Sequence, residues 1–155
     1  MTDVVYLIDS SAWSKMRSVK ELRDKKSHYL RPGKLVTCAP NLLELAYSAE
    51  NASPRAYDEL MALFGNAAIE IQSFWDTPNT VDSYSRVAYD IQRALFHAGQ
   101  GRSAGVFDIL IAAYAVLGNT DKRVVTVVHY DHDFEAIAAV EPRFHHEWIA
   151  PRGTL

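Results

Sequence analysis

Val4-Val5-Tyr6-Leu7-Ile8 is a continuous apolar run that leads directly into Asp9-Ser10-Ser11, and this stretch decides the fold class. Strands that are buried on both faces have such continuous runs, and they are typical of parallel sheets covered by helices. An Asp followed by serines is a common helix start, because its carboxylate accepts a hydrogen bond from a free N–H group of the first turn. The stretch therefore predicts a buried parallel strand that runs into a helix.

The same pattern recurs along the chain. The predicted elements are strands at 4–8, 35–39, 67–74, 124–128 and 144–149, with helices after residue 9, at 40–49, 54–64, 77–98, 106–117 and 131–140. Apolar residues at helical spacing support two of these helices: Leu42, Leu43, Leu45, Ala46 and Ala49 in one, and Val81, Tyr84, Val87, Ala88, Ile91, Leu95 and Phe96 in the other. This order predicts a three-layer α/β/α domain with a mostly parallel central sheet.

Composition limits the size and class of the protein. With 155 residues and 48% hydrophobic content, the chain can bury one core, so we expect a single domain over residues 1–155. The apolar run near the start is too short for a signal peptide or a membrane span, which favours a cytoplasmic protein without a membrane partner. The single cysteine, Cys38, lies in an apolar run and is expected to be a buried thiol.

Charge is unevenly distributed. The formal net charge of −3 argues against a protein that coats DNA nonspecifically. Half of the sixteen Lys and Arg residues nevertheless lie between positions 15 and 34, namely Lys15, Arg17, Lys20, Arg23, Lys25, Lys26, Arg31 and Lys34. This basic segment fits either a phosphate-binding surface or the solvated face of a helix, and the sequence leaves both open.

Four acidic positions are placed where a parallel sheet gathers functional groups. Asp9 and Asp131 follow the ends of predicted strands, and the carboxyl ends of parallel strands meet at one edge of the sheet. Glu44 and Asp108 lie in the early turns of predicted helices. Each acid has an ordinary alternative role, as a helix cap, a partner of the helix dipole or a surface residue. However, Glu44 and Asp108 have apolar neighbours, and a carboxylate in such surroundings needs a partner.

A divalent cation is the simplest partner for these carboxylates. No basic residue stands next to Glu44 or Asp108, and clustered carboxylates repel one another unless they take up protons or bind a cation. Oxygen ligands favour Mg²⁺ or Mn²⁺. The run His129-Tyr130-Asp131-His132-Asp133 contains imidazoles as well, so zinc remains an alternative.

The ordered set of motifs resembles the PIN-domain family, and in particular the VapC-type toxins of bacterial toxin–antitoxin pairs. The segments that carry the resemblance are Asp9-Ser10-Ser11 after an apolar strand, Leu42-Leu43-Glu44-Leu45, Phe107-Asp108-Ile109-Leu110-Ile111-Ala112-Ala113, and His129-Tyr130-Asp131-His132-Asp133-Phe134. The resemblance covers nearly the whole chain. It implies that Asp9, Glu44 and Asp108 are metal-site acids, with Asp131 as the preferred fourth acid and Asp133 as a possible further ligand.

The resemblance also implies an activity and partners. It implies an endoribonuclease that hydrolyses RNA with water activated by Mg²⁺ or Mn²⁺ and leaves 5′-phosphate and 3′-hydroxyl ends, and it implies a cognate VapB-like antitoxin and a homodimer. Ser10-Ser11 stand where the family often has Thr-Ser, and their hydroxyls can contact the substrate. Arg17, Lys20 and Arg102 are the candidates for contacts with RNA.

Three other functions remain to be weighed. The six histidines permit a metal-free nuclease that uses a His acid–base pair. A receiver-like or phosphatase-like domain would use Asp9 as its nucleophile, although such a phosphatase would want an Asp where Ser11 stands. A catalytically weak PIN-like binding module would act through partner or RNA binding, with its apolar helices at 42–49 and 57–64 as the contact surface.

Overall fold

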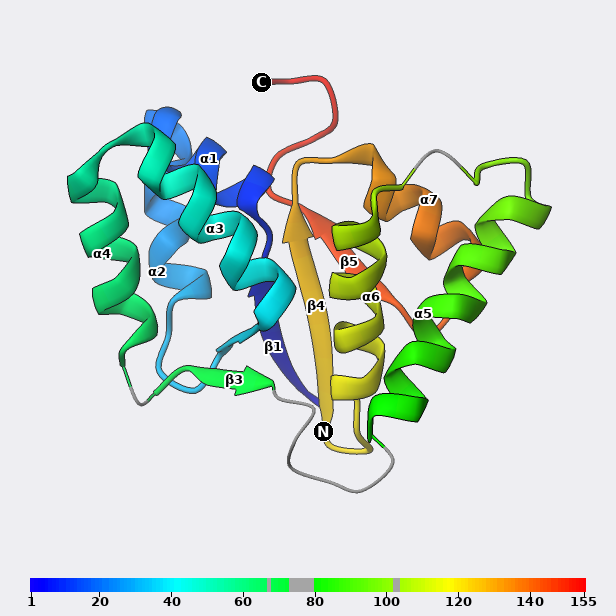
Figure 1. Cartoon of the computed structure of the whole chain (residues 1–155). Helices are drawn as coiled ribbons and strands as arrows, with labels where there is room; N and C mark the ends of the chain where they lie inside the picture. Colours follow the sequence, from blue (N-terminus) through cyan, green and yellow to red (C-terminus); the bar gives the residue numbers. More distant parts are fainter. Residues whose placement is uncertain (67, 73–79, 102–103) are drawn as a thin grey trace.

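The computed structural model describes residues 1–66, 68–72, 80–101 and 104–155. In chain order, the elements are β1 (Asp3–Ile8), α1 (Ser10–Ser18), the 3₁₀ helix η1 (Lys20–Lys25), α2 (Lys26–Tyr29), β2 (Leu35–Cys38), α3 (Ala39–Ala52), α4 (Pro54–Phe64), β3 (Glu70–Gln72), α5 (Thr80–His97), α6 (Val106–Gly118), β4 (Arg123–His129), α7 (His132–Val140) and β5 (His145–Trp148). Figure 1 shows these elements with β1 and β4 at the centre of the molecule.

The named strands form one five-stranded sheet in the order β3-β2-β1-β4-β5, and every pair of neighbours is parallel. β1 is the middle strand, and its Leu7 lies opposite Val36 of β2 and Val127 of β4. The apolar runs of β1 and β4 are explained by this central position, because both faces of these strands are covered. The predicted parallel sheet is therefore confirmed.

Helices cover both faces of the sheet, as Figure 1 shows: α5, α6 and α7 lie on one face, and α1 to α4 lie on the other. Neighbouring strand residues alternate between the two cores. Leu7 and Val127 pack toward α5, α6 and α7, whereas Ile8 and Val128 pack toward α1, α3 and α4. This arrangement confirms the predicted three-layer α/β/α architecture.

Among the helices whose first residues and caps the structure describes, three begin at a polar side chain that caps them. Asp9 accepts from the N–H of Ser11 at the start of α1, Ser53 accepts from that of Ala56 at the start of α4, and Asp131 accepts from that of Asp133 at the start of α7. Because α1 and α7 follow directly on β1 and β4, their capping carboxylates lie at the same edge of the sheet. The local sequence thus brings two of the predicted site residues together.

Two short elements were not predicted. The 3₁₀ helix η1 and helix α2 occupy the basic segment between α1 and β2. They lack the apolar periodicity of a longer helix, and they attach to the core mainly through Leu22 and Tyr29. The third strand was predicted at 67–74; the structure shows β3 over Glu70–Gln72, and part of the predicted range lies outside the described residues.

Two residues of the predicted apolar stripes are exposed. Phe96 of α5 is 71% exposed, and Leu43 of α3 is 64% exposed. Phe96 follows the buried Leu95 by one helical step of about 100°, whereas Leu43 is two steps from the buried residues Asn41 and Leu45, so both side chains point away from the core. Cys38 is buried, as expected. Among the described residues, no helix is both long enough and apolar enough to cross a membrane.

Candidate metal centre

The five predicted acids come from four places in the chain and meet at the carboxyl end of the sheet. Asp9 links β1 to α1, Glu44 lies in the second turn of α3, Asp108 is the third residue of α6, and Asp131 and Asp133 start α7. The acids affect one another electrostatically, because the charges of Asp9 and Asp131 add to burial in raising the pKa of Asp108.

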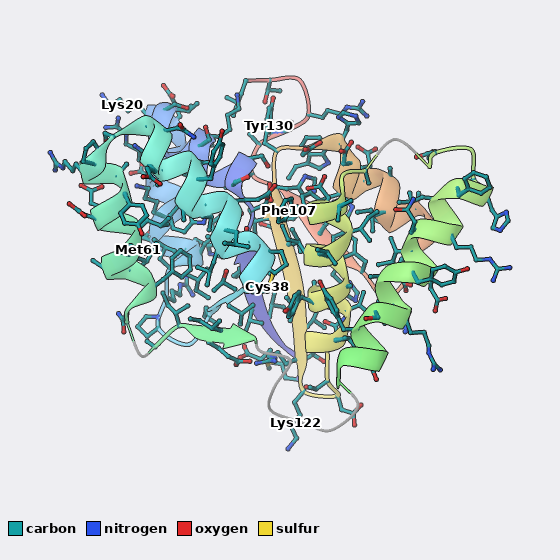
Figure 2. The ribbon with its side chains drawn as sticks, in the orientation of Figure 1. Lys20, Cys38, Met61, Phe107, Lys122 and Tyr130 are labelled. Carbon is teal, nitrogen blue, oxygen red and sulfur yellow. The ribbon has the colours of Figure 1, made fainter. Side chains whose placement is uncertain are left out.

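Figure 2 makes the position of this edge visible. Phe107 and Tyr130, which precede Asp108 and Asp131 in the chain, lie at one end of the sheet. Lys122, which precedes β4, lies at the opposite end. The acids therefore share the end of the sheet at which β1 and β4 terminate.

The acids form two groups. Carboxylate oxygens of Asp9, Glu44 and Asp108 lie within 4.8 Å of one another, which is close enough for one ion to contact all three. Asp131, His132 and Asp133 form the second group under the same distance limit. In this second group, the nitrogens of His132 lie 3.6 Å from Asp131 and 3.2 Å from Asp133.

Among the five acids of this site, Asp9 is the least exposed, at 3% of its surface. Its Oδ2 accepts hydrogen bonds from the N–H of Ser11 at 3.0 Å and from the hydroxyl of Ser11 at 2.6 Å. Its other oxygen, Oδ1, is buried and has no hydrogen-bond partner among the described residues. Helix capping therefore uses one oxygen of Asp9, and the other remains free to bind a ligand.

Burial raises the pKa of the acids, and their mutual repulsion adds to the effect. The pKa of Asp108 is raised to about 7, first by burial and then by the charges of Asp9 and Asp131. The pKa of Glu44 is raised by burial and by Asp9, although a hydrogen bond from Ser10 opposes this. Burial also raises the pKa of Asp9 and of Asp133. A divalent cation would relieve this repulsion and replace the bound protons.

The donor atoms fit a hard cation. Within the described ranges, Asp9, Glu44 and Asp108 form no salt bridge with Lys or Arg, and Asp131 and Asp133 pair with His132 alone. His129 is not available as a ligand, because Nδ1 accepts from the N–H of Asp131 at 3.1 Å and Nε2 lies 2.8 Å from Nδ1 of His146. The remaining oxygen-rich set suits Mg²⁺ or Mn²⁺ better than zinc.

The two predicted serines lie beside this site. The hydroxyl of Ser11 donates to Asp9 and accepts from the N–H of Tyr130 at 2.9 Å, so it joins the loop after β1 to the loop after β4. Ser10 hydrogen-bonds to the carboxylate of Glu44. Ser11 thus holds Asp9 in place, a role that the sequence did not reveal.

The predicted RNA-contacting residues are more scattered. Arg17 lines a groove between α1, α3 and α4, and Lys20 is exposed at the start of η1. The predicted contact Arg102 lies outside the described residues. The ammonium of Lys15 lies 4.9 Å from the centre of the Tyr130 ring, so this cation lies beside the loop that carries Asp131. The sequence does not indicate which of the eight basic residues between positions 15 and 34 faces Tyr130.

Asn41 is a further residue that sequence reasoning missed. Its side chain is 1% exposed, and its amide donates to the carbonyl of Ile8 at 3.0 Å and to the hydroxyl of Thr37 at 3.1 Å. It therefore ties the end of β1 to β2, directly before Asp9. A polar residue among the apolar residues at the start of a predicted helix was the available signal.

The chain is similar in sequence to known proteins over most of its length. The sequence model of the family described as PIN domain matches residues 6–140. Ribonuclease VapC18 of Mycobacterium tuberculosis is 32% identical over 98% of this chain and 100% of its own length. Ribonuclease VapC21 of the same species is 33% identical over 96% of each chain.

Solved structures show the same fold. A chain of the DNA-bound VapBC complex of Salmonella typhimurium superposes with a TM-score of 0.63, at 21% identity and with 97% of this chain and 100% of that chain covered. A chain of VapBC2 of Rickettsia felis, also in a complex with DNA, superposes with a TM-score of 0.63, at 18% identity, and covers 93% of this chain and 98% of its own.

Proposed function

The chain belongs to the PIN-domain family, and from this premise we propose that it is a Mg²⁺- or Mn²⁺-dependent endoribonuclease, the toxin of a toxin–antitoxin pair. The observation that carries the proposal is the meeting of Asp9, Glu44 and Asp108 within 4.8 Å, with the Asp131–Asp133 group beside them. The Mycobacterium tuberculosis relatives over nearly the whole chain are named ribonucleases, which supports RNA as the substrate.

We assign the acidic side chains to cation binding and the hydroxyl and basic side chains to substrate binding. Asp9, Glu44, Asp108 and Asp131 would hold the ion, with Asp133 as a further ligand. When bound, a divalent cation activates water for attack on a phosphodiester and stabilises the negative charge that develops on the phosphate. Ser11 keeps the free oxygen of Asp9 directed into the site, because the hydroxyl holds Oδ2.

Substrate binding would use hydroxyls and the basic segment. Ser10 and Ser11 lie next to the carboxylates and have remaining hydrogen-bonding capacity for a phosphate oxygen. Arg17, Lys20 and Arg102 would bind backbone phosphates farther along the RNA, where each cation contributes through counterion release. Attack by water does not require the RNA 2′-hydroxyl, so the preference for RNA depends on the surrounding surface.

We propose that a VapB-like antitoxin binds in the groove between α1, α3 and α4. The two superposed structures described above are VapBC complexes, which supports a partner of this kind. The groove is lined by Trp13, Leu45, Ala49, Leu60 and Leu63, with Arg17, Lys26 and Glu59 among its polar residues. The indole N–H of Trp13 beside this groove is buried and has no hydrogen-bond partner among the described residues.

We further propose a cytoplasmic homodimer in which residues 1–155 form one domain. One sheet joins β1 near the start of the chain to β5 near its end, which supports a single domain. Leu43 and Tyr47 of α3 are 64% and 73% exposed, so apolar surface for a second copy is present beside Glu44. The cytoplasm is the compartment in which both the RNA and the antitoxin of such a pair occur.

The test is RNA cleavage by the purified protein without a partner. Total cellular RNA is incubated with the protein in Mn²⁺, in Mg²⁺ and in EDTA, and the cleavage ends are mapped. We expect discrete cuts with 5′-phosphate and 3′-hydroxyl ends that disappear in EDTA and in Asp9→Asn. Cuts with cyclic-phosphate ends that persist in EDTA would show the metal-free mechanism instead.

A binding module is the second candidate, because the groove between α1, α3 and α4 offers a contact surface without catalysis. It predicts no cleavage by a folded protein under any of these metal conditions. It also predicts retention of partner or RNA binding in Asp9→Asn. The same incubation, combined with an RNA-binding assay, therefore separates the two functions.

A further inference from the structure

His129 is a fully buried imidazole that the proposed mechanism does not use. It is the last residue of β4, and its ring is 0% exposed. The rings of Phe134, His146 and Trp148 lie 4.8 to 5.0 Å away, so the imidazole sits among aromatic neighbours from α7 and β5.

The hydrogen bonds of the His129 ring determine which of its nitrogens carries the proton. The backbone N–H of Asp131 can only donate, so Nδ1 of His129 accepts at 3.1 Å and carries no proton. The proton of the neutral ring is therefore on Nε2, which donates to Nδ1 of His146 at 2.8 Å. The tautomers of both rings follow from a single backbone amide.

That amide belongs to a proposed metal ligand. The carboxylate of Asp131 also accepts from the N–H of Asp133 at 3.0 Å, and the preceding N–H, of Tyr130, donates to the hydroxyl of Ser11. Two consecutive amides are thus held from two sides, one by Ser11 and one by His129. The orientation of the backbone at Asp131 sets the direction in which its carboxylate leaves the chain.

We propose that His129 and His146 are positioning residues that fix Asp131 for cation binding. This inference rests on the proposed metal-dependent function. Groups that hold a metal ligand through a hydrogen bond commonly change metal affinity or activity tenfold to a hundredfold when they are replaced. The pair would act through the backbone N–H of Asp131, which donates to Nδ1 of His129.

A packing role is the competing explanation, and two substitutions at His129 separate the two roles. His129→Asn keeps an acceptor that can reach the N–H two residues ahead, as in an Asx turn. His129→Leu fills the aromatic surroundings but removes the acceptor. The positioning role therefore ranks Asn above Leu, whereas a packing role ranks Leu above Asn.

The measurement is the affinity for Mn²⁺ by calorimetric titration, with thermal unfolding as a check of folding. We expect His129→Leu to bind Mn²⁺ about tenfold more weakly than the wild type and His129→Asn to stay within about threefold. His146→Phe keeps the ring that stacks on Phe144 but loses the acceptor, and is expected to fall between them. Phe144→Leu is the control, because it changes the packing beside His146 without removing a hydrogen-bonding atom. Equal affinities for all variants, or the order Leu above Asn, would overturn the inference.

A second readout does not depend on the metal. ¹⁵N NMR of the metal-free wild type reports the tautomers, and we expect the proton of both rings on Nε2. A proton on Nδ1 of His129 would overturn the inference, even where His129→Leu fails to fold. If the wild type shows the expected tautomers but neither binds Mn²⁺ nor cleaves RNA, the proposed function fails instead. If the wild type binds and cleaves and His129→Leu matches it, only the positioning role fails.

Discussion

Asp108 is the acid with the largest expected effect on catalysis, because it lies near three other carboxylates and its pKa is raised to about 7. Asp108→Asn keeps the shape of the side chain and removes one anionic ligand. We expect the rate of RNA cleavage in Mg²⁺ to fall by about two orders of magnitude, which corresponds to roughly 3 kcal/mol of transition-state stabilisation. Asp58→Asn is the matched control, since Asp58 is an exposed acid of α4. Equal losses in both variants would contradict the assignment.

The same residue makes the stability of the metal-free protein depend on pH. The folded pKa of Asp108 lies above its ordinary value of 3.8, so the folded state binds the proton more tightly than the unfolded state. Its contribution is fully present below about pH 4 and is lost as the pH rises through about 7. At pH 8, the free energy of unfolding of Asp108→Asn should therefore exceed that of the wild type by about 1–2 kcal/mol, after an allowance for solvent screening. The difference should shrink at pH 4.

Chemical denaturation in EDTA at the two pH values measures this difference. Saturating Mn²⁺ supplies the comparison, because a bound cation neutralises the carboxylates and should remove the advantage of Asp108→Asn. A variant that is less stable than the wild type at pH 8 in EDTA would show that Asp108 is not under electrostatic strain.

The carboxylates were predictable from the sequence, whereas the residues that hold them were not. Glu44 and Asp108 stood out because an acid with apolar neighbours needs a partner. The roles of His129 and Asn41 depend on contacts with His146 and Ile8, which lie 17 and 33 positions away in the chain. Contacts between residues so far apart in the chain depend on the order of the strands in the sheet. That order is set by the packing of the whole sheet and not by a local sequence pattern.

At the scale of elements, apolar runs and end signals predicted nearly all of the strands and helices. β1 and β4 are continuous apolar runs because they lie in the middle of the sheet. η1 and α2 escaped prediction because each is held by few buried residues, namely Leu22 and Tyr29. Phe96 shows that sequence pattern alone does not establish burial, because this apolar residue lies next to the buried residues of α5 and is itself exposed.

Helix α4 offers a test at this scale. Ser53 caps it by accepting from the N–H of Ala56 at 3.1 Å. Ser53→Ala should lower the free energy of unfolding by about 1 kcal/mol, because the N–H group loses its acceptor. Equilibrium denaturation measures this loss. RNA cleavage by the partner-free protein should not change below the unfolding transition, since Ser53 lies outside the acidic site. A loss of cleavage without a loss of stability would contradict this separation.

At the scale of the whole molecule, the cation should act as a stabilising ligand. The proposed ligands come from α1, α3, α6 and α7, so binding one ion joins helices from both faces of the sheet. Mn²⁺ at about one hundred times its dissociation constant should stabilise the fold by about 2.7 kcal/mol, if it binds the native state alone. Thermal unfolding with increasing Mn²⁺ measures this effect, and EDTA should reverse it. An unchanged unfolding temperature would mean that the folded protein has no such site.

The most direct test of the central claim, one cation site built from these carboxylates, is anomalous diffraction from crystals of the wild-type protein grown with Mn²⁺. We predict an anomalous peak among Asp9, Glu44 and Asp108, with Asp131 as a further ligand, and no peak there in crystals of Asp9→Asn. A peak bound by histidine nitrogens away from these acids, or no peak in crystals with saturating Mn²⁺, would contradict the account.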